Sequence, residues 1–111
     1  MQAISFGLIQ VPSPGTPVQI TTDPSITACL LMVRTIPGFT GKTYLGLAGM
    51  NKSSAAKTGV IRVLSEPAFG PQDGEFIPPT GRAHGNVLRV SDFWVDADVA
   101  GEGVLVTGFV A

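Results

Sequence analysis

Three acidic residues form the densest group of side chains capable of chemistry. Asp96, Asp98 and Glu102 lie within seven positions, together with Gly101. Closely spaced carboxylates on a tight turn can supply the oxygen ligands that calcium prefers. A helical calcium loop starting at Asp96 would need an oxygen ligand at position 100 and a glutamate at position 107, but these are Ala and Thr. We therefore expect a solvated hairpin turn with glycine at positive φ, and a non-standard calcium site is the alternative.

The single histidine and the single cysteine do not complete a catalytic or zinc-binding set. His84 lies in a loop-like segment, and no spacing brings it a nucleophile and an orienting acid. Cys29 lies in the most apolar segment, where we expect a small buried hydrophobic residue and not a reactive thiol. We therefore expect no enzymatic activity, no cofactor and no metal.

Strands are the elements that must position these residues. Gly and Pro together number 23 and are scattered along the 111 residues, which excludes long helices. The 29 Val, Ile and Thr residues favour strands. Runs of apolar and alternating residues predict strands at 4–9, 18–21, 26–36, 43–48, 59–64 and 104–110, a stretch at 86–95 made of two strand pieces, 87–90 and 92–95, and one short strand at 75–77. The sequence thus predicts an all-β fold, a single domain over residues 1–111 built as a small β-sandwich or barrel of about seven or eight strands.

Breaks between the strands add detail to this prediction. Residues 12–17 form a Pro-rich turn, and residues 66–85 form a long Pro- and Gly-rich loop, of a length that usually serves function or a partner. Residues 51–57 are the only candidate for a short helix, with a polar loop as the alternative. Gly46 predicts a bulge or a close backbone contact. The strand at 26–36 is apolar on both faces, so it is central or meets another subunit.

The composition excludes several classes of protein. Only 14% of the residues are charged and 44% are hydrophobic, so the chain is not disordered. A net charge of −1 predicts no direct binding to nucleic acid or to an anionic membrane. No 18-residue apolar run, no signal peptide and no pair of cysteines is present, which predicts a chain made in a reducing cytoplasm. With a mean hydropathy of +0.35, we expect a neighbour to cover part of the apolar surface.

The charges are segregated along the chain. Between residues 24 and 65 all charged residues are basic, namely Arg34, Lys42, Lys52, Lys57 and Arg62. Between residues 91 and 104 all are acidic, namely Asp92, Asp96, Asp98 and Glu102. One interpretation is two solvated faces of opposite sign. The other is docking between complementary patches of identical or different subunits.

Three segments carry a resemblance to a known family. The stretch 15–20, the stretch 42–46 and the C-terminal run 92–104 resemble, in this order along the chain, segments of small β-rich structural proteins of tailed bacteriophages. The resemblance implies a virion protein, made in the bacterial host cytoplasm, with no catalysis. Its most direct form is a capsid decoration (cement) protein that bridges shell subunits, with the major capsid protein or other virion subunits as partners and a homotrimer as the expected oligomer.

Two alternatives remain beside this interpretation. One is a neck or tail accessory protein, and the other is a small carbohydrate-binding β-sandwich that uses Trp94, Tyr44 and the turn at residues 96–98. Trp94 is expected in the core, which disfavours the second. The residues predicted to contact a partner are Arg34, Lys42, Lys52, Lys57, Arg62, Asp96, Asp98, Glu102, Pro78, Pro79 and His84.

Overall fold

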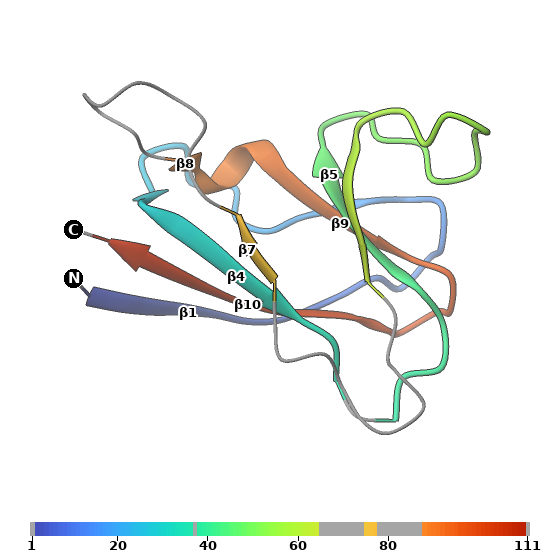
Figure 1. Ribbon diagram of the computed structural model, residues 1–111, viewed down its shortest axis with the longest axis horizontal. Coiled ribbons are helices and arrows are strands. Elements are labelled where there is room, and N and C mark those ends of the chain that lie inside the picture. Colours follow the sequence, from blue (N-terminus) through green and yellow to red (C-terminus); the bar gives the residue numbers. More distant parts are fainter. Residues whose placement is uncertain (1, 37, 65–74, 78–87, 111) are drawn as a thin grey trace.

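Two four-stranded antiparallel sheets dominate the computed structural model, which describes residues 2–36, 38–64, 75–77 and 88–110 (Figure 1). The first sheet has the order β1-β10-β4-β7, the second β2-β9-β5-β6, and β3 pairs with β8. The strands are β1 (Gln2–Gln10), β2 (Val18–Gln19), β3 (Thr27–Ala28), β4 (Leu30–Arg34), β5 (Thr43–Leu47), β6 (Val60–Leu64), β7 (Glu75–Ile77), β8 (Leu88–Arg89), β9 (Phe93–Ala97) and β10 (Gly103–Val110). The predicted all-β fold is confirmed.

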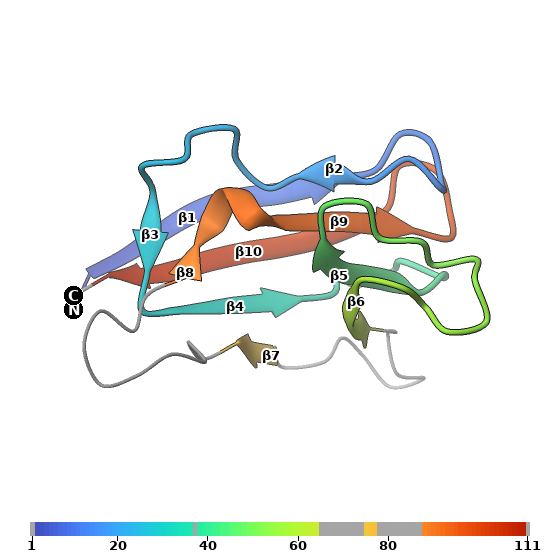
Figure 2. The same cartoon turned by 90° about the horizontal axis from the view of Figure 1, so that it is seen from above.

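The core lies between the inner faces of the two large sheets. Every second side chain of β4 and β10 is fully buried, as Leu31, Val33, Val104 and Val106 show. They belong to one apolar cluster with the inner residues of the second sheet, such as Leu45. This alternation is that of a β-sandwich, in which each sheet buries one face against the other. The two chain ends lie side by side at one end of the first sheet (Figures 1 and 2).

The expected strand at residues 26–36 is divided in two. Thr27 and Ala28 pair with β8, whereas the strand from Leu30 onward lies between β10 and β7. The break falls at Cys29, whose backbone N–H donates to the carbonyl of Phe109 at 2.6 Å. The thiol residue is half-buried, not fully buried as expected. The central position predicted for this apolar strand is confirmed for β4.

The loop between β5 and β6 contains turns and no helix. Asn51 N–H donates to the carbonyl of Thr58 at 2.8 Å and closes the loop, so the polar-loop alternative is the correct one. The described residues contain one helical turn elsewhere, the 3-10 turn η1 (Val90–Asp92) between β8 and β9. The pairing of β5 with β6 shifts at Gly46, where a Cβ atom would meet the carbonyl oxygen of Gly59 at 2.5 Å. The predicted bulge and close contact are both confirmed.

The remaining predictions concern the long loop at residues 66–85 and the short strand within it. The short strand expected at residues 75–77 is confirmed as β7. Pro78, Pro79, His84 and the rest of the loop at 66–85 lie outside the described residues. Across the described ranges, no helix has the length and apolar character needed to cross a bilayer.

Candidate binding surfaces

Glu102 is a buried carboxylate that holds a distant loop in place. Its side chain is only 8% exposed. Oε2 accepts the backbone N–H of Thr40 and Oε1 accepts that of Gly41, both at 2.9 Å, and the Thr40 hydroxyl lies 3.4 Å from Oε2. Hydrogen bonds to a carboxylate are stronger than those between neutral groups. The expectation that this glutamate lies on a solvated turn is therefore wrong.

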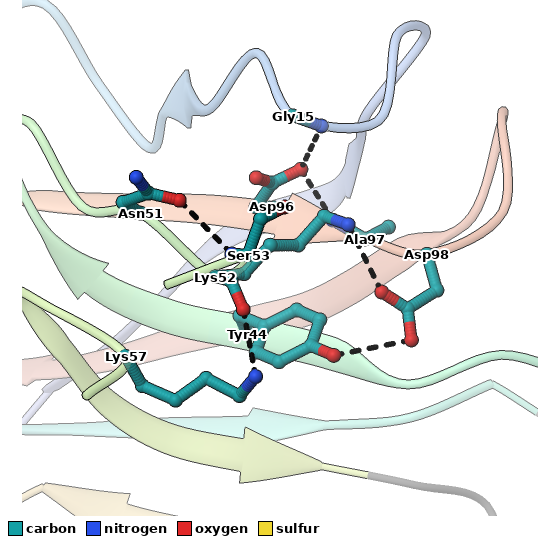
Figure 3. Close-up of polar contacts among 9 residues, drawn as sticks. All are labelled: Gly15, Tyr44, Asn51, Lys52, Ser53, Lys57, Asp96, Ala97 and Asp98. Atoms are coloured by element: carbon teal, nitrogen blue, oxygen red, sulfur yellow. Dashed lines mark hydrogen bonds and ion pairs between the residues drawn. The ribbon is translucent and has the colours of Figure 1, made fainter. Parts of the chain in front are cut away.

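Asp96 plays the same part for the Pro-rich turn at residues 12–17. Its side chain is 1% exposed, on the strand β9. Oδ1 accepts the backbone N–H of Gly15 at 3.0 Å and that of Ala97 at 2.7 Å (Figure 3). A buried charge has to be satisfied in this way, because an unpaired one is costly. Asp96 is thus a structural residue, and the expectation that it lies on a solvated turn is wrong.

Asp98 takes part in a polar cluster on the outer side of the second sheet (Figure 3). Lys52 Nζ lies 3.1 Å from Asp98 Oδ1 in an ion pair, and the Tyr44 hydroxyl donates to Oδ2 at 3.1 Å. The same ammonium group lies 5.7 Å from the centre of the Tyr44 ring, within reach of a cation–π contact. The basic and acidic segments therefore neutralise each other here within one chain, through the ion pair of Lys52 with Asp98.

Titration of the single tyrosine provides a direct test of this cluster. Burial raises the pKa of Tyr44 above 10.0, and the hydrogen bond to Asp98 and the charges of Asp98 and Asp96 raise it further. As the pH rises, the phenol loses its proton in the unfolded chain before it does so in the folded chain. Tyr44 therefore contributes stability that is fully present below pH 10 and is lost as the pH rises through the folded-state pKa. We expect tyrosinate absorbance to appear at higher pH in the folded protein than in the chain unfolded by denaturant.

The variant Asp98→Asn serves as the matched control. It removes the charge beside the phenol, so its tyrosinate midpoint should lie below that of the wild type while the protein remains folded. Because the chain has one tyrosine, the absorbance has only one source. A folded-state midpoint at or below that of the unfolded chain would contradict the buried, hydrogen-bonded Tyr44.

The three acidic residues do not converge on a common point. Asp96 accepts hydrogen bonds from the N-terminal turn, Asp98 faces Lys52, and Glu102 binds the 40–41 loop. In the described part of the chain, no three His, Cys, Asp or Glu side chains come together as metal ligands. The geometry therefore lends no support to the calcium alternative.

The other basic candidates make separate local contacts. Lys57 Nζ donates to the carbonyl of Lys52 at 2.7 Å, and Arg62 donates to the carbonyl of Ile61 at 3.3 Å. Lys42 is exposed beside the acidic turn, where its carbonyl accepts the N–H of Asp98. Arg34 lies at the end of β4, and its buried Nε has no hydrogen-bond partner among the described residues.

An apolar face that sequence reasoning did not delimit lies on the outer side of the first sheet. Three strands contribute to it in register, since β1 pairs with β10 and β10 with β4. We call it the open face; its members are Ala3, Ser5, Leu8, Leu30, Met32, Arg34, Leu105, Thr107 and Phe109. All are half-buried or exposed, and Arg34 is the only charged member. The expectation of surplus apolar surface thus has a definite location.

A second surface surrounds the single tryptophan. Trp94 is half-buried, and it lines an open hollow of about 430 Å³ with Gln19, Leu47, Ala48, Ser91 and Asp92. The expectation of a core tryptophan is wrong, because β9 turns Phe93 and Val95 inward and Trp94 outward. Alternation along residues 93–95 indicated an outward Trp94. Its polar neighbour Gln19 lies in a strand 75 positions away and could not be found from spacing.

Comparison with known proteins adds no relative. No protein-family model, no curated protein and no solved structure matches the chain.

Proposed function

We propose that this protein is a structural component of a tailed-phage virion and that it acts as a capsid decoration protein. The resemblance of residues 92–104, 15–20 and 42–46 to such proteins suggests it. The open face is the observation that carries the proposal, since a cement protein needs an apolar surface to bury against the shell. The proposed partners are the major capsid protein or other virion subunits, and the proposed location is the virion.

The open face has the character of an interface core. Leu105 of β10 lies opposite Leu8 on one side and opposite Arg34 on the other, and Phe109 lies opposite Leu30. Interface centres are depleted in charge and enriched in aromatic residues, Met and Arg, as this face is. Many copies that each bury such a face across capsid seams would act together, as in any multivalent lattice.

The loops next to the sheets are held in fixed positions by the buried carboxylates. Asp96 ties down the turn that follows β1, and Glu102 ties down the loop that follows β4. Prolines 12, 14 and 17 fix further backbone angles in the first of these segments. A surface that is already ordered loses little entropy on binding, which suits a small protein that contributes one weak bridge among many.

The test is retention on expanded, DNA-free phage heads. We expect the wild-type chain to sediment with the heads, and the variant Thr107→Lys, which places an ammonium in the middle of the open face, to remain in the supernatant. Val63→Lys adds the same charge at a site 46% exposed on the second sheet and should bind as the wild type does. If heads do not retain the wild type, or retain both variants equally, the open face is not a capsid-binding surface.

The hollow at Trp94 favours a second candidate function, a carbohydrate-binding module. An exposed indole face can stack against a sugar ring, and Asp92, which has no hydrogen-bond partner among the described residues, can accept sugar hydroxyls. The volume of about 430 Å³ lies within the range of small-ligand sites. Binding to arrayed glycans would test this candidate function. Fluorescence gives a second readout, because Trp94 is the only tryptophan and its emission should change on binding. Glycan binding without retention on heads would replace the capsid proposal.

A further inference from the structure

The hollow at Trp94 contains one carboxylate that nothing neutralises. Among the described residues that line the hollow, Asp92 is the only charged side chain, and it is exposed. It makes no ion pair in the described part of the chain, whereas Asp98 is paired with Lys52 at 3.1 Å. A carboxylate in this state attracts a positively charged group and repels an anion.

The basic residue nearest to Asp92 in the sequence belongs to another part of the fold. Arg89 precedes Asp92 by three positions, but it lies on β8, opposite Thr27 of β3 in the two-stranded sheet. It does not line the hollow, and neither does any other basic residue of the described ranges. A positive charge beside Asp92 would therefore be supplied by a ligand.

A second oxygen acceptor lies in the same hollow. Gln19 of β2 lies opposite Trp94 of β9, and its Nε2 donates to the carbonyl of Ser91 at 2.7 Å. This bond fixes the side-chain amide and leaves Oε1 with no hydrogen-bond partner among the described residues. Ammonium and guanidinium groups carry donors and no acceptors, so they match two acceptor oxygens of this kind.

The indole of Trp94 completes the site. The side chain is half-buried on the outer side of the second sheet, where β9 lies between β2 and β5 (Figure 2). Of the aromatic side chains, tryptophan attracts a cation over its ring most strongly, and a guanidinium can also stack on it. An indole next to an unpaired carboxylate thus favours a positively charged organic group over a neutral one.

We infer that the hollow at Trp94 binds an organic cation, whose ammonium or guanidinium group lies against the indole and pairs with the Asp92 carboxylate. The inference rests on the second candidate function, since it concerns the same hollow, and it names the ligand class: a sugar with a protonated amine, and not a neutral or acidic sugar. A lysine or arginine side chain of a partner protein offers the same chemistry, and the test separates the two sources.

Two pairs of ligands that differ in charge but little in shape test the inference on the full chain. Glucosamine hydrochloride has an ammonium group where glucose has a hydroxyl group. Nα-acetylargininamide has a guanidinium group where Nα-acetylcitrullinamide has a neutral ureido group. Sodium chloride equalises the ionic strength within each pair. Ligands of this size bind in the millimolar range, so each is titrated to about 50 mM. The signal is the emission of Trp94, the only tryptophan.

We expect at least one cation to change the emission at about fivefold lower concentration than its neutral counterpart, from the ion pair and the ring contact together. Asp92→Asn should abolish this preference. Asp98→Asn, which removes an acid already paired with Lys52, should keep it. The inference is overturned if neither cation is preferred, if no ligand changes the emission, if the preference survives in Asp92→Asn, or if both variants lose it equally.

The same titrations distinguish this inference from the functions proposed above. Equal binding of glucosamine and glucose, with no preference in the arginine pair, overturns the inference and leaves the carbohydrate candidate in place. A response to the arginine ligand alone supports the inference, assigns the cation to a protein partner and contradicts the carbohydrate candidate. Neither outcome bears on the capsid proposal, because the open face lies on the first sheet and Trp94 on the second.

Discussion

Replacing Gly103 with alanine is expected to destabilise the protein by about 3 kcal/mol or more, the upper end of what overpacking costs. Gly103 opens β10 opposite Gln10, where the two strands approach closely. A Cβ atom at this position would overlap the carbonyl oxygen of Ile9 and lie 3.0 Å from the Cα of Gln10. Both are backbone atoms, so the strands themselves would have to separate. Urea denaturation followed by circular dichroism measures the loss.

Gly101→Ala is the matched control, two positions earlier in the same turn. Gly101 has a φ of +86°, and a Cβ atom there meets nothing within 4 Å. Its substitution therefore carries only the cost of a left-handed backbone, about 1–2 kcal/mol. If the two variants were equally stable, the close approach of β1 and β10 would not be the reason for glycine at position 103.

Local sequence patterns predicted most of the strands but not how they are divided between sheets. Apolar and alternating runs predicted the ends of β5, β6 and β10 to within one residue. The same signal could not show that residues 26–36 belong to two sheets. That division depends on pairing of Ala28 with Leu88 and of Leu30 with Phe109, both of which join segments far apart in the sequence.

The acidic turn shows why the candidate site was harder to predict than the fold. Charge and spacing indicate a solvated turn when only neighbouring residues are considered. The groups that bury Asp96 and Glu102 are backbone N–H groups at Gly15, Thr40 and Gly41, which lie 61 to 81 positions away. A backbone donor leaves no trace in residue type. The only sequence signal was that glycines lie at two of the three positions. A Cβ atom at Gly41 would lie 3.4 Å from Glu102 Oε1, whereas Gly15 has a φ of +90°.

Replacing Glu102 with glutamine should lower the free energy of unfolding by about 2–3 kcal/mol, although the two side chains have nearly the same shape. The carboxylate accepts from Thr40 and Gly41 through different oxygen atoms. An amide offers one acceptor oxygen, so one backbone N–H would face an NH₂ group, and the charge that strengthens both bonds is lost. The corresponding fall in melting temperature is roughly 10 °C or more for a domain of this size.

Asp92→Asn removes the same charge at an exposed side chain with no hydrogen-bond partner among the described residues, and should change stability by less than about 0.5 kcal/mol. Equal effects in thermal denaturation would mean that net charge, and not the hold of Glu102 on the 40–41 loop, sets the stability of this turn.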